Sequence, residues 1–224
     1  MTDRCPYTPR LYDFLGRLAA NNNREWFRAH RDEYDCLRAL WLADVDRLIA
    51  CMAQWEPALA GITARSAAYR IYRDTRFSPD KTPFKTYFSA SLTPHGRSAR
   101  RAGYYLQMGP GGSGLFGGIW CPDAPLLRKL RQAIVDNIEE WDAINADPAL
   151  CDRFGLISSS MLKTVPKGWP KDHPQAAWLR MKDYGREAAV TDGFFMSADW
   201  PERAADMFRH VKPFNDFLNY SIDE

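Results

Sequence analysis

The spacing of apolar residues changes twice along this 224-residue chain, and this change restricts the folds that it can adopt. Between Leu11 and Met52 apolar side chains recur every three or four positions, which predicts helices. Four short aromatic and β-branched runs follow, separated by turn residues, and these predict antiparallel strands. Helical spacing returns after Pro122. Helices, then strands, then helices indicate an α+β fold rather than alternating strand and helix units.

The same patterns place the elements along the chain. We expect helices at 9–20, 26–37, 41–52, 127–141 and 201–218, and strands at 69–72, 86–92, 103–108, 115–120 and within 179–190. No repeat or linker divides the sequence. We therefore expect one domain over residues 1–224, with its core at about 9–220. In this domain, N-terminal helices precede a central antiparallel sheet, and further helices pack on it.

Cysteine usage and the first residues suggest a cytoplasmic protein. No basic patch followed by an apolar stretch opens the sequence, so a secretory signal is not expected. The five cysteines are odd in number and contain no Cys-x-x-Cys pair, which favours free thiols. Residues 102–122 carry no charge but include seven glycines, which indicates a glycine-rich hairpin and not a membrane span.

Motifs for cofactors and metals find little support. Gly112, Gly114 and Gly117 match a dinucleotide-binding pattern, but a strand-like run follows them where that site requires a helix, so we expect a β-hairpin and no cofactor. The histidines are widely spread and show no zinc-site spacing, so no metal is expected. His173 differs from the others because it lies in a polar, proline-rich loop, where an imidazole would remain accessible for proton transfer.

Positive charge is concentrated in one part of the chain. The formal net charge of +2 divides into +7 for residues 61–102 and −5 for the remainder. Within this region, the stretch 70–85 interleaves five cations with two carboxylates and reads as a strand, a turn and a strand. The cations are Arg70, Arg73, Arg76, Lys81 and Lys85, and the carboxylates are Asp74 and Asp80.

Two accounts of this stretch remain open. In the first, the five cations bind an anionic ligand such as a phosphate or a carboxylate, and Asp74 or Asp80 orients them or acts as a base. His173 would then be the proton-transfer group of an enzyme. In the second, the two carboxylates pair with the arginines and only fix the loop. Two acids cannot neutralise five cations locally, which favours a ligand, although acids elsewhere in the chain could do so.

Four segments of the chain carry a family resemblance. They are Asn21-Asn22-Asn23-Arg24-Glu25-Trp26-Phe27, the Arg-Asp-x-Arg-Phe-Ser-x-Asp-Lys-x-Pro-Phe-Lys order within 70–85, Gly117-Gly118-Ile119-Trp120, and Lys171-Asp172-His173-Pro174 with Leu179-Arg180-x-Lys182. Through these segments the chain resembles domain of unknown function 2461, a microbial family, from about residue 11 to 218. The resemblance implies an intracellular, single-domain protein and supplies no activity. Phe84 stands where tyrosine is more usual, which would matter if a phenol hydroxyl acted there.

Three functions therefore compete. The first is binding of an anionic small molecule through the basic stretch, with or without catalysis. The second is a non-catalytic module that binds a partner protein, in which the basic cluster is structural. The third is weak nucleic-acid binding, because Arg97, Arg100 and Arg101 extend the basic region towards Tyr104 and Tyr105. We expect no membrane partner.

Overall fold

The computed structural model describes residues 7–94, 96–97, 100–158 and 160–224, and it confirms the α+β class with N-terminal helices, an antiparallel sheet and further helices. The α-helices are α1 Thr8–Ala20, α2 Arg24–Ala29, α3 Arg31–Met52, α4 Ala64–Ala67, α5 Ala124–Asp136, α6 Ile138–Ala146, α7 Pro148–Cys151, α8 Ala176–Leu179 and α9 Trp200–Asp223. The 3-10 helices are η1 Pro57–Leu59 and η2 Asp192–Met196. The strands are β1 Phe88–Leu92, β2 Gly103–Met108, β3 Gly114–Ile119, β4 Gly155–Leu156 and β5 Tyr184–Ala188.

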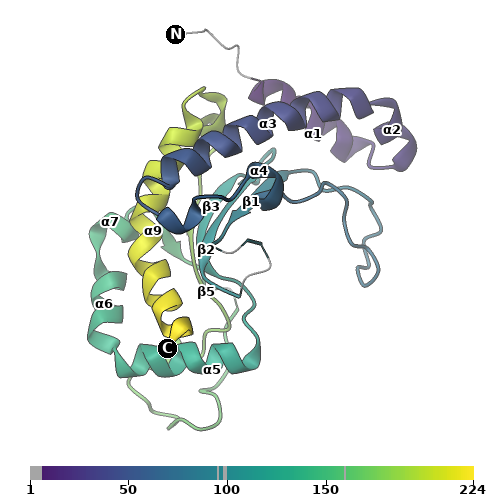
Figure 1. Cartoon of the computed structure of the whole chain (residues 1–224). Coiled ribbons are helices and arrows are strands. Elements are labelled where there is room, and N and C mark those ends of the chain that lie inside the picture. The colour runs from purple at the N-terminus through teal and green to yellow at the C-terminus, as the bar shows by residue number, and fades with distance from the viewer. Residues whose placement is uncertain (1–6, 95, 98–99, 159) are drawn as a thin grey trace.

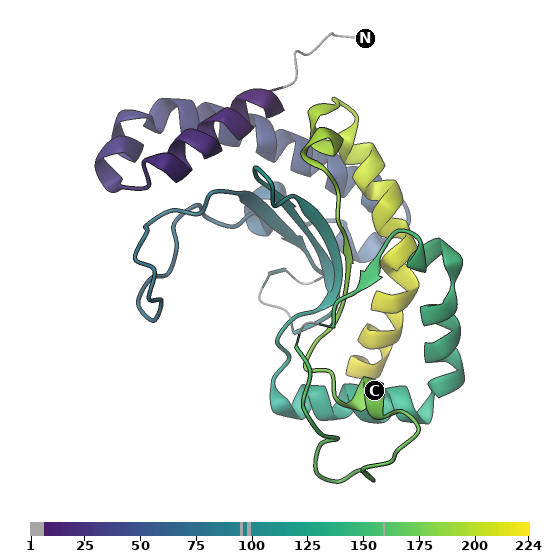
Figure 2. The ribbon, with the colours of Figure 1, turned by 180° about the vertical axis from the view of Figure 1, so that it is seen from behind.

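The five strands form one curved sheet in the order β1-β2-β3-β5-β4, and each neighbouring pair is antiparallel. Helices α3 and α9 cross one face of this sheet (Figures 1 and 2), and α5 lies across one end of the molecule. Among the described residues, no helix covers the opposite, concave face in these views. We call this second face the open face.

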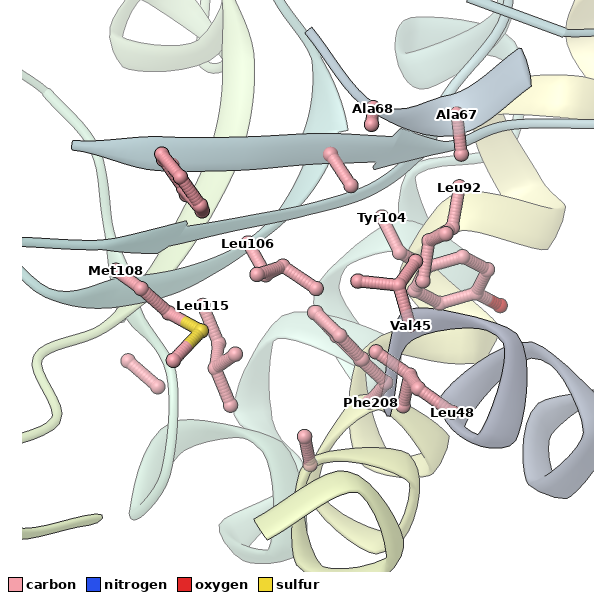
Figure 3. Packing of buried hydrophobic residues seen from close by; sticks show 14 of the residues in the cluster. Val45, Leu48, Ala67, Ala68, Leu92, Tyr104, Leu106, Met108, Leu115 and Phe208 are labelled. Atoms are coloured by element: carbon pink, nitrogen blue, oxygen red, sulfur yellow. The ribbon is translucent and has the colours of Figure 1, made fainter. Parts of the chain in front are cut away.

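The core lies between the sheet and the two long helices (Figure 3). Val45 and Leu48 of α3 and Phe208 of α9 meet Leu106 and Leu115 of the sheet, and all five are fully buried. Strand side chains alternate between the two faces, so β2 and β3 send every second residue into this core. The intervening residues of the same strands point to the open face.

Helix boundaries differ from the sequence prediction at two places. The helices expected at 26–37 and 41–52 are wrong in extent, because the chain breaks at His30 and then continues as one helix, α3. His30 leaves helical geometry, stacks on Trp26 at 3.9 Å between ring centroids, and its Nδ1 lies 2.8 Å from the Trp26 carbonyl oxygen. The helix expected at 127–141 is likewise divided, because Asn137 ends α5 and precedes α6.

The strands predicted at 86–92, 103–108 and 115–120 are present as β1, β2 and β3, whereas the strand predicted at 69–72 is not. Residues 69–72 form no continuous strand; Ala68 and Tyr72 make only isolated bridges, to Ala90 and Phe84. The strand expected within 179–190 is present as β5, which begins at Tyr184, after the short helix that ends at Leu179. The hairpin expected around the glycines is confirmed by the pairing of β2 with β3.

Candidate functional site

Residues 70–85, which we call the arm, leave the edge of the sheet and project from the body of the protein (Figures 1 and 2). Its two halves run antiparallel: the Arg73 N–H donates to the Pro83 carbonyl at 2.9 Å, and the Lys85 N–H donates to the Ile71 carbonyl at 2.8 Å. The strand, turn and strand expected from the sequence is therefore present as a paired ribbon, without the regular strand at its start.

Charged groups at the outer end of the arm are bonded to one another. The Arg73 guanidinium donates to the carboxylate of Asp80 and to the hydroxyl of Thr82. The Thr82 N–H also donates to Asp80, at 2.9 Å, and this bond and the nearby guanidinium lower the pKa of Asp80 to about 2. Arg73 and Asp80 thus fix the conformation of the loop.

Arg76 and Asp74 form a second pair in the arm. The Arg76 guanidinium donates from Nε and Nη2 to the two carboxylate oxygens, at 3.0 and 2.6 Å. These bonds lower the pKa of Asp74 to about 2. Beyond this pair, the Lys81 ammonium donates to the Thr75 carbonyl at 2.9 Å. Arg73, Arg76 and Lys81 therefore all have partners within the arm.

The two remaining predicted ligand residues lie at the base of the arm and have different surroundings. Lys85 is half-buried, and its Nζ lies 5.0 Å from the ring centroid of Tyr69 and 5.8 Å from that of Tyr87. Burial lowers the pKa of Lys85, and the positive charges of Arg70 and Arg97 lower it further. Among the described residues, none of these three cations forms an ion pair with a carboxylate.

Arg97 is the member of this cluster that the anion hypothesis did not include. Its guanidinium donates to the Ala68 carbonyl at 2.6 Å and lies 5.3 Å from the Tyr69 ring centroid. Lys85 and Arg97 therefore contact the same aromatic ring. The question of internal pairing, which the sequence left open, thus has a different answer at each end of the arm. Internal ion pairs occupy the outer end, whereas no carboxylate of the described residues forms an ion pair with the cations at the base.

A cavity of about 810 Å³ lies over the open face, beside this cluster. Its floor consists of side chains from β1, β2, β3 and β5. The residues that line it include Tyr69, Lys85, Arg97, Tyr105, Phe116 and Glu187. Trp120, which is 67% exposed, stands at the rim. The cavity is large enough for an organic molecule of moderate size.

Two further arginines line this cavity, and both are neutralised. Arg100 forms an ion pair with Asp123, and the Arg101 guanidinium donates to both carboxylate oxygens of Asp223, at 2.5 and 2.6 Å. The nucleic-acid hypothesis counted these two arginines as free phosphate contacts. That hypothesis stays a prediction, now with fewer unpaired charges to support it.

A second cavity, of about 560 Å³, lies under the arm and is lined by Arg73, Asp74, Asp80 and Lys85 among others. The structure therefore brings these four predicted residues together, with Lys85 shared between the two cavities. His173 lines neither of them. Its Nδ1 accepts a hydrogen bond of 3.0 Å from the Gln175 N–H, and its ring lies edge-on to Trp169. The catalytic roles of His173, Asp74 and Asp80 remain untested predictions.

Cys121 shows no sign of activation as a nucleophile. Cys121 lines the larger cavity, but burial and the neighbouring carboxylate of Asp183 raise the pKa of its thiol. Within the described ranges, no three His, Cys, Asp or Glu side chains gather in a way that could hold a metal ion. The described cysteines are free, whereas Cys5 and His95 lie outside the described residues.

The chain was also compared with known proteins. The model of the family described as "Conserved hypothetical protein (DUF2461)" matches residues 10–217. The chain belongs to this family. Neither the curated proteins nor the solved structures give a match to this DUF2461 chain. Within the part of the chain that the structure describes, no helix has both the length and the apolar character needed to cross a bilayer.

Proposed function

We propose that this DUF2461 protein binds a small anionic ligand, bearing a phosphate or a carboxylate, in the cavity over the open face. The observation that carries the proposal is the cluster of Arg70, Lys85 and Arg97, which have no ion pair within the described residues, while other arginines of the region do. Arg70 and Arg97 are exposed, whereas Lys85 is half-buried. Burying an unpaired ammonium is unfavourable, and an anion bound beside Lys85 would relieve this cost.

The surroundings of the cluster support the same proposal. Lys85 and Arg97 border a cavity, so a ligand has access to them. A planar guanidinium beside an ammonium is a common arrangement for holding a carboxylate or a phosphate. Arg73, Arg76 and Lys81, which are bonded within the arm, then have the role of keeping the arm in place.

Isothermal titration calorimetry with phenyl phosphate and with inorganic phosphate tests the proposal. Lys85→Met and Arg97→Gln each remove one charge from the cluster, and we expect either change to weaken binding about tenfold or more, as for a hydrogen bond to a charged group. Lys81→Met is the matched control, because its ammonium donates to the Thr75 carbonyl within the arm. Absence of binding to the wild-type protein, or an equal loss in the control, would overturn the proposal.

A protein-binding module is the second candidate, and one observation favours it. Phe77 is 93% exposed, near the outer end of the arm, and the Arg76 guanidinium lies 5.8 Å from its ring centroid. An aromatic ring beside an arginine is a common anchor in protein interfaces. If the arm binds a partner, Phe77→Ala should abolish a stoichiometric complex that Tyr220→Ala, at a 68% exposed position on α9, leaves intact.

A further inference from the structure

One row of side chains crosses the open face from strand to strand. Ser91 of β1 is paired with Tyr105 of β2, Tyr105 with Phe116 of β3, and Phe116 with Glu187 of β5. Directly paired residues project from the same face of a sheet. All four line the cavity, which confirms that this shared face is the open one.

The middle of this row is aromatic. The ring centroids of Tyr105 and Phe116 lie 5.6 Å apart, and those of Tyr69 and Tyr105 lie 6.1 Å apart. The planes of Tyr69 and Tyr105 are inclined at 66°, and those of Tyr105 and Phe116 at 58°. The three neighbouring rings therefore form an aromatic floor against which a planar ligand can pack with offset or edge-on geometry.

The two ends of this floor carry opposite charges. Lys85 and Arg97 lie over Tyr69 at one end. At the other end Glu187 is exposed, and among the described residues it makes no ion pair or side-chain hydrogen bond. Because Arg100 and Arg101 are paired elsewhere, the charged groups of the described lining that have no ion pair are two cations at one end and the carboxylate of Glu187 at the other.

The distance between the charged ends limits the size of the ligand. Three strand spacings separate β1 from β5, which amounts to about 14 Å between their backbones. Lys85, Arg97 and Glu187 extend into the cavity from either side. The two cations lie over Tyr69, whose N–H donates to Ser89 of β1, and Glu187 lies on β5, so a molecule that reaches both ends spans about the width of these strands, less the reach of the three side chains.

We propose that the ligand is amphoteric: an acidic group binds to Lys85 and Arg97, a planar ring stacks on Tyr105 and Phe116, and an ammonium group binds to Glu187. This inference rests on the proposed function, since it assumes that the cationic end binds an anion. In addition, the Glu187 carboxylate on the opposite side of the cavity favours ligands that carry a positive charge at the end far from their acidic group, by electrostatic complementarity.

Calorimetry with a matched pair of compounds tests the second charge. The probes are 4-(2-aminoethyl)phenyl phosphate and 4-ethylphenyl phosphate, which share the phosphate and the ring and differ in the amine. We expect the amine to strengthen binding to the wild-type protein about tenfold. In Glu187→Gln this advantage should disappear, while the affinity for 4-ethylphenyl phosphate stays unchanged. Glu139→Gln, an exposed carboxylate on α6 outside the cavity, is the control and should retain the advantage.

A second pair, 4-(2-aminoethyl)benzoate and 4-ethylbenzoate, shows whether the acidic group is a phosphate or a carboxylate, and an amine advantage dependent on Glu187 in either pair supports the inference. Equal binding of the amine and ethyl compounds, with both weakened in Lys85→Met, would overturn the amphoteric ligand and leave the anion site standing. No binding of any of the four compounds would overturn both.

Discussion

Asn22 binds the backbone of Phe84 on both sides: its amide donates to the Phe84 carbonyl at 2.9 Å, and its carbonyl oxygen accepts from the Phe84 N–H at 3.1 Å. Asn22 follows α1, and Phe84 lies at the base of the arm. Two of the segments that carry the family resemblance therefore meet in space. The Phe84 ring is 2% exposed and stacks on Phe27 at 4.1 Å, so this position serves packing in the present chain.

Replacing Asn22 should loosen the base of the arm. Asn22→Ala leaves two part-buried backbone groups of Phe84 without their partner, and we expect the free energy of unfolding to fall by about 1–3 kcal/mol. Urea unfolding followed by circular dichroism measures this loss. In the control Asn21→Ala, the lost bond is to the exposed end of α1, and the effect should be smaller. Equal losses in both variants would contradict this reading.

Gly117 allows α9 to approach the sheet closely. A Cβ added at this position would lie 2.5 Å from Cγ2 of Val211, which is fully buried. Gly117→Ala should therefore destabilise the protein by about 1–3 kcal/mol, as overpacking of a core does. The double variant Gly117→Ala with Val211→Ala removes the clash and should be more stable than the sum of the two single changes predicts, as measured by thermal unfolding. Additive losses of stability would show that the contact between positions 117 and 211 does not determine how closely α9 approaches the sheet.

Anion affinity should depend on the protonation of Lys85. Its pKa is lowered from 10.5, so the cationic form is lost, and affinity falls, at a lower pH than for an ordinary lysine. A bound anion favours the charged form, so binding should raise this pKa and take up protons. Calorimetry with inorganic sulfate, which keeps its charge over this range, measures both effects. Lys85→Met should abolish the dependence; a wild-type affinity that is constant with pH would be evidence against a role for Lys85.

The ion pairs of Asp74 and Asp80 in the arm should persist to a lower pH than those of carboxylates with ordinary pKa values. Asp74 and Asp80 have pKa values of about 2, below the usual 3.8. Because folding lowers these values, the contribution of both groups to stability is complete above the unfolded pKa and is lost as the pH falls through about 2. Carboxyl carbon chemical shifts followed by NMR report this titration. Midpoints near 3.8 would show that the pairs do not persist in solution.

The spacing of apolar residues predicted the order of the long helices and of β1, β2, β3 and β5, but it did not predict the short strand β4 or the positions at which helices break. His30 and Asn137 each interrupt a stretch whose apolar spacing continues through them. At His30 the break depends on ring stacking and on a side-chain contact with a carbonyl, which the spacing of apolar residues does not encode. The prediction of a strand at 69–72 was wrong because apolar and aromatic residues alone do not show how far a segment pairs with its neighbours. This part of the chain forms only isolated bridges, from Ala68 to Ala90 of β1 and from Tyr72 to Phe84 in the other half of the arm.

The candidate site was predictable in part. Counting charges identified Lys85 and Arg70, but could not show that the internal pairs would form at the outer end of the arm alone. The open face was missed because adjacent positions on β2 have the same side chain. Tyr104 is 1% exposed and packs in the core, while Tyr105 lies in the row with Ser91 and Phe116 on the open face. Without a polar and apolar alternation, sequence gives no sign of which face is buried.

The edges of the sheet have a consequence for how copies of this protein meet. A long unpaired edge strand recruits strands from other molecules. Here β4 ends one side after two residues, and on the other side β1 is partly covered where the Tyr69 N–H donates to the Ser89 carbonyl at 2.9 Å. Addition of a strand from another molecule is therefore disfavoured at both edges of the sheet. The open face can then remain accessible to small molecules without an exposed sheet edge that would promote aggregation.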